Sequence, residues 1–345
     1  MPRSAVVLVL CGVLCGALFG AAGAAAETLS PVGIRGVEFS DGDRRIALFV
    51  FYPAKPDSGA KPFVLPFTTN LSLLDDPPPD VGAGRRPLIM LSHGRGSNGL
   101  LYAWFAQYLA ERGYIVAAIN HYRANTWNSD ITYLSGKIWQ RPKDIAKAID
   151  FLLADPVWGA AIDAQKIGVA GHSQGGFTSL WVGGAEVSAE RFLAFQRGWK
   201  NNRMVPAHLR AEMPLDPSPA LDVRDPRVRA AFAMAPGIIK AFGMDEAGLR
   251  AMPVPAYITV GARDTQTPPG PNAEFAAEHI PNAELVVIPG LVDHEIFTNQ
   301  CDAEGRDEFP EACIDAAGVD RAAIHASVGA AAEKFFGEKL GVDRR

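Results

Sequence analysis

Short apolar runs alternate along most of the chain with longer segments in which apolar residues recur every three or four positions. The short runs predict strands, and they comprise residues 37–39, 46–52, 87–91, 114–120, 167–170, 228–234, 257–260 and 285–288. The longer segments predict helices at residues 100–112, from Pro142 through Leu152, and at residues 321–340. Strands that alternate with helices predict an α/β fold, in which helices flank a mostly parallel central sheet.

One segment, residues 185–225, departs from this alternation because it is polar, interrupted by prolines and rich in arginine. Within it, residues 191–195 predict a short amphipathic helix. An insertion here would lie at the carboxyl ends of the strands, where such sheets bind ligands. We therefore expect a cap or lid, or a wall of the substrate pocket. A surface excursion with no role in binding is the alternative.

The N-terminus has the pattern of an export signal. Arg3 precedes an apolar stretch at residues 5–19, and a row of three alanines ends at Ala26. This pattern predicts a signal peptide at residues 1–26 and a periplasmic or secreted protein. An uncleaved anchor is the alternative, although the apolar stretch is short for a membrane span. Residues 27–345 are expected to form one α/β domain.

The charge and the cysteine content reduce the range of possible partners and of possible roles for the cysteines. The 345-residue chain has a formal net charge of −5 and no cluster of basic residues, which argues against nucleic acid as a partner. After removal of the signal, Cys301 and Cys313 remain, close together in a polar loop. In an oxidising compartment such a pair predicts a disulfide. Two free thiols are the alternative, and a metal site is less favoured because no His or Cys lies nearby at zinc spacing.

Residues 171–175 spell Gly-His-Ser-Gln-Gly, with Ser173 at the centre. A short β-rich run precedes this pentapeptide and a helical pattern follows it. A serine at such a junction can occupy a sharp strand-to-helix turn that lifts its hydroxyl above the edge of the sheet. The flanking glycines fit that turn because a Cβ would clash there. Ser173 is therefore the candidate nucleophile.

A serine hydroxyl needs a base to accept its proton and an acid to orient the base. On this type of sheet the acid and then the histidine follow late strands, in that chain order. Asp264 follows the strand predicted at 257–260, and His294 follows the last predicted strand, so they are the candidate acid and base. An ordinary turn aspartate is the alternative for Asp264. Three other histidines are less suited by position: His121, His172 and His325.

The negative charge that develops on the substrate carbonyl needs N–H donors, which form the oxyanion hole. One expected donor is the backbone N–H of Gln174, directly after the nucleophile. The other is expected in the glycine-containing loop at residues 92–97, where the N–H of Arg95 is the candidate. A plain strand-to-helix turn is the alternative for that loop.

Together, the Leu-Ser-His-Gly stretch at residues 91–94, the pentapeptide around Ser173, and Asp264 and His294 resemble the α/β-hydrolase fold. The chain is similar to secreted bacterial members of the dienelactone hydrolase-like and platelet-activating-factor acetylhydrolase-like group. The resemblance runs over residues 37–340 and implies a serine esterase that forms an acyl-enzyme. Dienelactone hydrolases proper carry a cysteine where this chain has Ser173.

No cofactor or metal is expected. The glycines at 94 and 96 lack the third glycine and the later acidic residue of a dinucleotide site. Three adjacent side chains at 293–295 cannot all converge on one ion. We expect a small-molecule or lipid-like ester as substrate. A peptidase or amidase with the same triad, and a binding protein on a hydrolase fold, are the alternatives.

Overall fold

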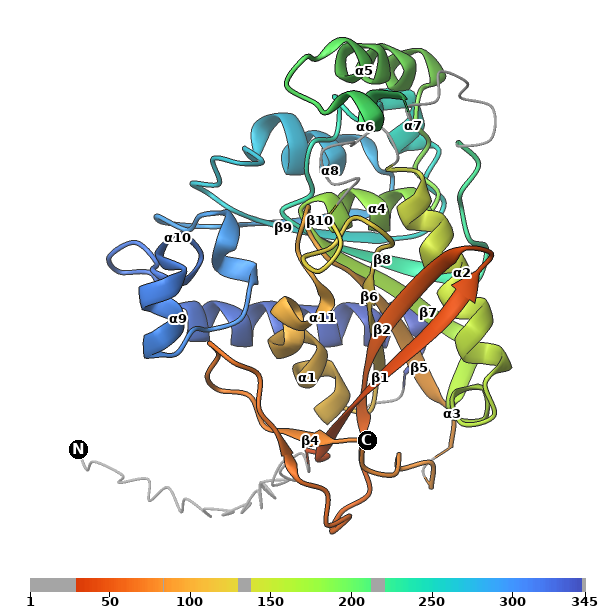
Figure 1. The fold of residues 1–345 in the computed structure, drawn as a ribbon, viewed down its shortest axis with the longest axis vertical. Coiled ribbons are helices and arrows are strands. Elements are labelled where there is room, and N and C mark those ends of the chain that lie inside the picture. Colours follow the sequence, from red (N-terminus) through yellow and green to blue (C-terminus); the bar gives the residue numbers. More distant parts are fainter. Residues whose placement is uncertain (1–28, 83, 130–137, 212–220, 343–345) are drawn as a thin grey trace, which may run out of the picture.

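The computed structural model describes residues 29–82, 84–129, 138–211 and 221–342. The predicted signal peptide, residues 1–26, lies outside this part. A ten-stranded sheet crosses the molecule, with helices on both faces (Figure 1). The strands are β1 (Val32–Asp41), β2 (Arg44–Pro53), β3 (Pro62–Phe63), β4 (Leu73–Asp75), β5 (Arg86–Ser92), β6 (Ile115–Asn120), β7 (Ile162–His172), β8 (Val228–Met234), β9 (Ala256–Gly261) and β10 (Ala283–Ile288).

The strands lie in the order β10-β9-β8-β7-β5-β6-β2-β1-β4-β3. From β10 to β6 every neighbouring pair is parallel, whereas β2 joins β6 and β1 in antiparallel pairs. The chain passes from β5 to β6 on one side and then returns across β5 to form β7 on the other. Such a reversal opens a crevice at the carboxyl ends of β5 and β7, where ligands bind in open α/β sheets.

The helices are α1 (Ala103–Glu111), α2 (Gln140–Ala154), α3 (Trp158–Ala161), α4 (Gln174–Val182), α5 (Ala189–Asn201), α6 (Ala207–Ala211), α7 (Glu246–Arg250), α8 (Phe275–His279), α9 (Ala303–Glu308), α10 (Pro310–Cys313) and α11 (Arg321–Leu340). The 3₁₀ helices η1 (Gly99–Tyr102) and η4 (His294–Phe297) and the π-helical turn η3 (Gly270–Glu274) complete them. No helix in the described ranges is long and apolar enough to cross a membrane.

The central strands are buried on both faces, which explains their near-continuous apolar sequences. Two glycines of β7 show how closely the helices pack. A Cβ on Gly168 would lie 2.6 Å from the Phe336 ring of α11, whereas a Cβ on Gly171 would lie 2.9 Å from Ser179 Oγ of α4. Positions three apart in a strand face opposite sides, so α11 and α4 cover opposite faces of the sheet.

The structure confirms the predicted α/β fold and each predicted strand and helix, most of them extended by a few residues. It adds two short strands, β3 and β4, in the segment between β2 and β5. The helix predicted at 191–195 is the central part of α5, which begins after the N-cap Ser188. In Figure 1, α5 and α6 form an outlying layer at one end of the molecule.

Candidate active site

Ser173 occupies the strained turn between β7 and α4, with φ 55° and ψ −120°. A non-glycine residue rarely adopts this conformation, and such strain is concentrated at functional sites. The neighbouring glycines make the turn feasible. A Cβ on Gly175 would lie 1.9 Å from the Ser92 carbonyl oxygen, and one on Gly171 would lie 2.3 Å from that of Gly175. The sequence around Ser173 therefore specifies a tight strand-to-helix turn at the crevice between β5 and β7, with the geometry of a nucleophile elbow.

Asp264 and His294 form a direct pair. The Nδ1 atom of His294 lies 2.6 Å from Asp264 Oδ2, and both side chains are buried. Asp264 follows β9, where its Oδ1 accepts the N–H groups of Thr267 (2.7 Å) and Gln266 (3.0 Å). The hydroxyl of Thr267 donates to Oδ2 at 2.9 Å. The carboxylate is thus fixed in the orientation that holds Nδ1–H and leaves His294 Nε2 free to accept a proton.

The charge state of Asp264 follows from these contacts. Burial raises the pKa of Asp264, but the hydrogen bond and charge of His294, with the two donors of Thr267, outweigh that effect and leave the pKa below its usual value. The carboxylate therefore stays ionised at neutral pH. An ionised partner at Nδ1 can stabilise the imidazolium that forms when His294 takes up a proton.

Ser173 and His294 line the same pocket, which has a volume of about 610 Å³. The loop after β5 forms another part of its lining, including Gly94 and Arg95. A Cβ on Gly94 would lie only 3.5 Å from Ser173 Cβ, so this loop directly adjoins Ser173. The Ser173 hydroxyl has no hydrogen-bond partner among the described residues. In ligand-free serine hydrolases the contact to the base is often long and tightens when substrate binds.

Two backbone donors lie unused beside the serine. Gln174 begins α4, where the first N–H groups of a helix have no intrahelical acceptor. Within the described ranges, neither the Gln174 N–H nor the Arg95 N–H donates to a protein acceptor. Of the five predicted residues, Ser173, His294 and Arg95 line one pocket at the carboxyl edge of the sheet, Gln174 directly follows Ser173, and Asp264 contacts His294.

The remaining walls of the pocket are mostly apolar. Phe67 and Phe309 meet edge to face with their ring centroids 5.3 Å apart. Leu100 and Leu101 extend the apolar lining, and Trp127, which is 62% exposed and packs on Phe49, contributes another wall. Three other large aromatic residues, Trp104, Trp139 and Phe192, do not belong to the described lining.

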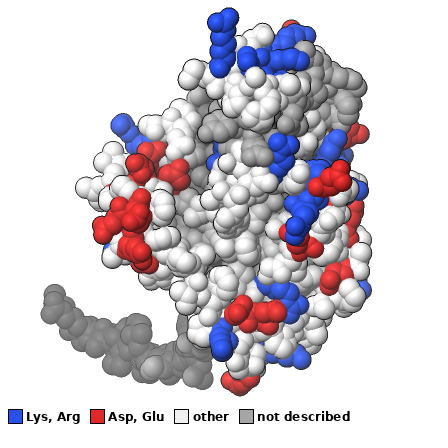
Figure 2. Space-filling model, in the orientation of Figure 1, with Lys and Arg blue, Asp and Glu red and all other residues white. Residues whose placement is uncertain are grey.

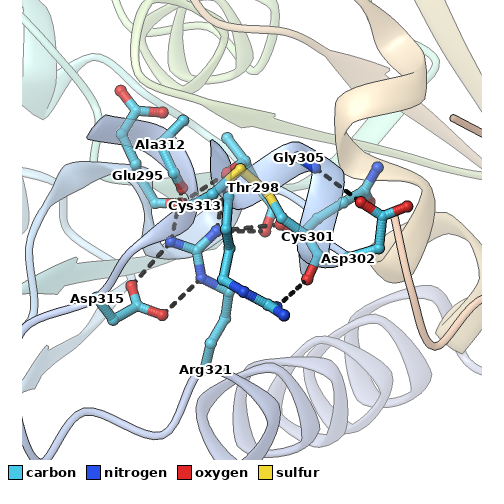
Figure 3. Close-up of a disulfide and its surroundings, with 11 residues drawn as sticks. Glu295, Thr298, Cys301, Asp302, Gly305, Ala312, Cys313, Asp315 and Arg321 are labelled. Atoms are coloured by element: carbon cyan, nitrogen blue, oxygen red, sulfur yellow. Dashed lines mark hydrogen bonds and ion pairs between the residues drawn. A yellow bond between two sulfur atoms is a disulfide. The ribbon is translucent and has the colours of Figure 1, made fainter. Parts of the chain in front are cut away.

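The predicted disulfide joins Cys301 to Cys313, and both cysteines line the pocket. Figure 3 shows the bond beside Arg321, the first residue of α11. The Arg321 guanidinium contacts Asp315 at 2.8 Å and 2.9 Å and donates to the carbonyl oxygens of Asn299 (3.0 Å) and Ala312 (2.8 Å). The disulfide and the Arg321 contacts thus join the two ends of this loop to each other and to α11. The loop directly follows the segment that carries His294.

The segment after His294 is also held by two buried side chains, Trp104 and His325. Trp104 Nε1 donates to the Phe297 carbonyl at 2.8 Å, and its ring stacks on His325 with centroids 3.7 Å apart. His325 Nε2 lies 2.7 Å from the carbonyl oxygen of Ile296. Burial lowers the pKa of His325 to about 3, so the ring is neutral and serves as a packing element, as its position within α11 predicts.

Two regions of the face shown in Figure 2 carry mainly one sign of charge, whereas both signs are mixed elsewhere on it. Lys and Arg side chains gather over α5, and acidic side chains gather over α9 and α10, next to the disulfide wall of the pocket. Four exposed carboxylates on these helices are Glu304, Asp307, Glu308 and Glu311. Near Ser173 itself the pocket holds one charge of each sign, from Arg95 and Glu295. No group of His, Cys, Asp or Glu in the described ranges could hold a metal ion.

Comparison with solved structures identifies the fold. The ferulic acid esterase from Streptomyces cinnamoneus superposes with a TM-score of 0.63 at 20% identity, over 93% of this chain and 94% of that one. The dienelactone hydrolase from Anabaena variabilis superposes with a TM-score of 0.50 at 17% identity, over 89% and 98% of the two chains. The chain has the α/β-hydrolase fold. The predicted resemblance to this fold is confirmed, and the structural relatives include an esterase.

Sequence matches to this α/β-hydrolase chain are shorter. The pattern of the Prolyl oligopeptidase family matches residues 101–207, which include Ser173 but neither Asp264 nor His294. The Dipeptidyl-peptidase 5 of Porphyromonas gingivalis is 31% identical over 127 residues, which are 34% of this chain. The matched stretch spans only 17% of that relative's length. The family match covers the turn that carries Ser173.

Two features of this α/β-hydrolase site were not predicted from the sequence. The ring centroid of His172 lies 4.5 Å from that of His294, so His172 contacts the candidate base. The wall around Phe67 and Phe309 comes from segments that showed no binding pattern. The described pocket lining contains no residue of 185–225, and residues 212–220 lie outside the described part, so a lid formed by this segment stays a prediction.

Proposed function

We propose that this protein is a serine hydrolase that cleaves carboxylic esters through a Ser173–His294–Asp264 triad. One observation carries the proposal: His294, which lies 2.6 Å from Asp264, lines the same pocket as Ser173, a serine in a strained strand-to-helix turn. A buried Asp–His pair alone is a common structural motif. A serine hydroxyl at the same pocket, with two unused N–H donors beside it, is what catalysis of acyl transfer requires.

The reaction would proceed in two steps. Ser173 Oγ attacks the ester carbonyl carbon while His294 Nε2 takes the hydroxyl proton, and Asp264 stabilises the imidazolium. The N–H groups of Gln174 and Arg95 bind the oxyanion, which collapses as His294 returns the proton to the leaving alcohol. Water, deprotonated by the same histidine, then hydrolyses the acyl-enzyme and restores Ser173.

The pocket favours an ester over a peptide. Its walls around Phe67, Leu101, Trp127 and Phe309 are apolar, and they suit an aryl or alkyl group better than a polypeptide backbone, whose polar groups need partners when buried. The fold relative from Streptomyces cinnamoneus is a ferulic acid esterase, which supports the same choice. A peptidase with the same triad is the second candidate, because the Prolyl oligopeptidase pattern matches residues 101–207.

The charges around the pocket indicate an uncharged substrate. The acidic residues of α9 and α10 stand next to the disulfide wall, so a carboxylate on the substrate would meet repulsion on that side. We therefore expect neutral esters to be hydrolysed faster than analogues that carry a carboxylate, and the difference to shrink as salt screens the charges.

Matched substrates test this proposal. A 4-nitrophenyl ester and the 4-nitroanilide of the same acyl group differ in the bond that is cleaved, and a series of acyl groups from acetyl to dodecanoyl, with one aryl acyl group, maps the apolar walls. We expect the ester to exceed the anilide in kcat/KM by more than a hundredfold. A preference for the anilide would replace the esterase proposal with the peptidase.

Export is the second part of the proposal. The signal pattern at residues 1–26 and the Cys301–Cys313 disulfide both fit an oxidising compartment. N-terminal sequencing of protein recovered from a host's periplasm or medium should find Glu27 as the first residue. Recovery of an intact N-terminus from the cytoplasm, with both thiols free, would contradict export.

A further inference from the structure

The carbonyl group of Gly94, beside the nucleophile, is held from the interior of the protein. Gly94 O accepts hydrogen bonds from His93 Nδ1 (2.6 Å), Arg141 Nη2 (3.0 Å) and Ser97 N (3.4 Å). Arg141 also donates Nη1 to the His93 carbonyl at 2.7 Å, so one guanidinium spans two successive carbonyls. The His121 N–H donates to His93 Nε2, which assigns the proton of the His93 ring to Nδ1.

This arrangement determines where the next N–H group points. The described peptides are all trans, and across a trans peptide the C=O and N–H bonds point in opposite directions. Because the Gly94 carbonyl is directed at the buried Arg141, the Arg95 N–H is directed away from it, toward the pocket that Arg95 shares with Ser173. Burial lowers the pKa of Arg141 to about 9, which still leaves the guanidinium charged at neutral pH.

The N–H group of Gly94 is held by a second residue. It donates to Tyr102 Oη at 3.1 Å, so it cannot serve an oxyanion. Tyr102 Oη lies 3.0 Å from His172 Nδ1, and His172 Nε2 lies 3.2 Å from the carbonyl oxygen of His294. A carbonyl oxygen accepts, so Nε2 carries the proton of His172 and Tyr102 donates to Nδ1. Burial, together with the charge of His294, holds the pKa of His172 well below its usual value and keeps this ring neutral.

We propose that Arg141 and Tyr102 are positioning residues of the oxyanion hole, which fix the Gly94–Arg95 peptide so that the Arg95 N–H faces the substrate carbonyl oxygen. This inference rests on the proposed function. Both act through hydrogen bonds to the backbone of this loop. Arg141 holds the carbonyl group of the Gly94–Arg95 peptide and that of the preceding His93–Gly94 peptide, and Tyr102 holds the N–H group of the latter. Because the peptides on both sides of the Gly94 Cα are held, the Gly94–Arg95 peptide is prevented from rotating.

Two substitutions test the inference, Tyr102→Phe and Arg141→Lys. Phenylalanine lacks the acceptor for the Gly94 N–H, and lysine keeps the charge but cannot span two carbonyls as a guanidinium does. Loss of one oxyanion donor lowers kcat by about 10²–10³-fold in serine hydrolases. A donor that is displaced rather than removed should cost about tenfold or more in kcat for 4-nitrophenyl butyrate, with KM changed less than twofold.

The inhibition constant of an aryl trifluoromethyl ketone is a second measurement, and a loss of stability alone does not change it. Ser173 Oγ adds to the carbonyl carbon of this ketone, the hydroxyl proton passes to His294, and the ketone oxygen becomes an oxyanion in the hole. Its inhibition constant should rise in both variants by about the same factor as kcat/KM falls. A merely structural role would lower the melting temperature and leave the inhibition constant of the folded protein unchanged.

Tyr52→Phe is the matched control. Tyr52 is also buried and donates its hydroxyl to a backbone carbonyl, that of Pro77 at 2.6 Å, away from the pocket. Its kcat and inhibition constant should equal those of the wild type. The inference is overturned if folded Tyr102→Phe keeps wild-type kcat and inhibitor affinity, whether or not Arg141→Lys folds. That result, with wild-type protein active and Ser173→Ala inactive, would leave the proposed function standing, whereas an inactive wild type would overturn both.

Discussion

Removal of the disulfide with Cys301→Ala and Cys313→Ala should loosen one wall of the pocket while the triad stays intact. The loop between the two cysteines carries α9, α10 and Phe309 of the pocket wall. It is joined to the opposite segment by the hydrogen bond from Asp302 N to Phe67 O at 3.2 Å. Both aromatic residues of the wall therefore depend on the position of this loop.

The magnitude follows from the length of the closed loop. The cysteines are 12 positions apart, and the chain-entropy relation for a loop of this size gives about 3 kcal/mol of stabilisation. For a domain of this size, that loss corresponds to a decrease of roughly 5 °C in the melting temperature. Arg321 continues to hold the Ala312 carbonyl and Asp315 in the variant, so the loop should loosen without detaching.

Calorimetry and ester kinetics on the same samples provide the assay. We expect the lower melting temperature together with a KM raised several-fold, and a kcat within twofold of the wild type, because Asp264 and His294 make no contact with the disulfide. Mild reduction should change the melting temperature and KM of the wild-type protein by the same amounts and leave those of the variant unchanged. If neither the melting temperature nor KM changes, the disulfide does not stabilise the wall. A fall in kcat at constant KM would show that the bond supports the triad instead.

Three further predictions concern the triad and its turn. Asp264→Asn should lower kcat by about 10⁴-fold at nearly unchanged melting temperature, and a loss below tenfold in steady-state ester hydrolysis would exclude Asp264 as the acid. The pKa of Asp264 is depressed below its ordinary value of 3.8, so protonation of its carboxylate should add no second step to the acid-side fall of log kcat/KM above pH 4, where the slope should not exceed one. A slope of two above pH 4 would contradict this depressed pKa. Gly175→Ala should lower the free energy of unfolding in urea by about 3 kcal/mol or more, because its Cβ would overlap the Ser92 carbonyl, and a wild-type value would contradict the tight turn.

The sequence predicted those parts of the site that local chemistry specifies. Ser173 stands between two glycines that its turn requires, and Asp264 and His294 follow late strands in the order that the sheet imposes. The central strands were predictable because burial on both faces demands continuous apolar runs. Each of these signals lies within a few neighbouring residues, where the pattern can be seen without the fold.

The remaining parts of the site depend on contacts between distant segments. Arg141 reaches the loop after β5 from a helix that begins almost fifty residues later, and no local pattern distinguishes a buried arginine from a surface one. Tyr102 and His172 meet across 70 positions. The pocket wall pairs Phe67 with Phe309, which come together only when the sheet and the disulfide loop are in place. Such contacts are products of tertiary packing.

The role of Ser173 as the nucleophile can be measured by mass spectrometry after reaction with a fluorophosphonate. We expect one adduct per chain, located by peptide mapping on Ser173, and loss of ester hydrolysis in proportion to labelling. The folded Ser173→Ala variant should take up no label and retain less than a tenth of the wild-type activity. Labelling at another residue, or a Ser173→Ala variant that still hydrolyses esters at a tenth of the wild-type rate or more, would exclude Ser173 as the nucleophile.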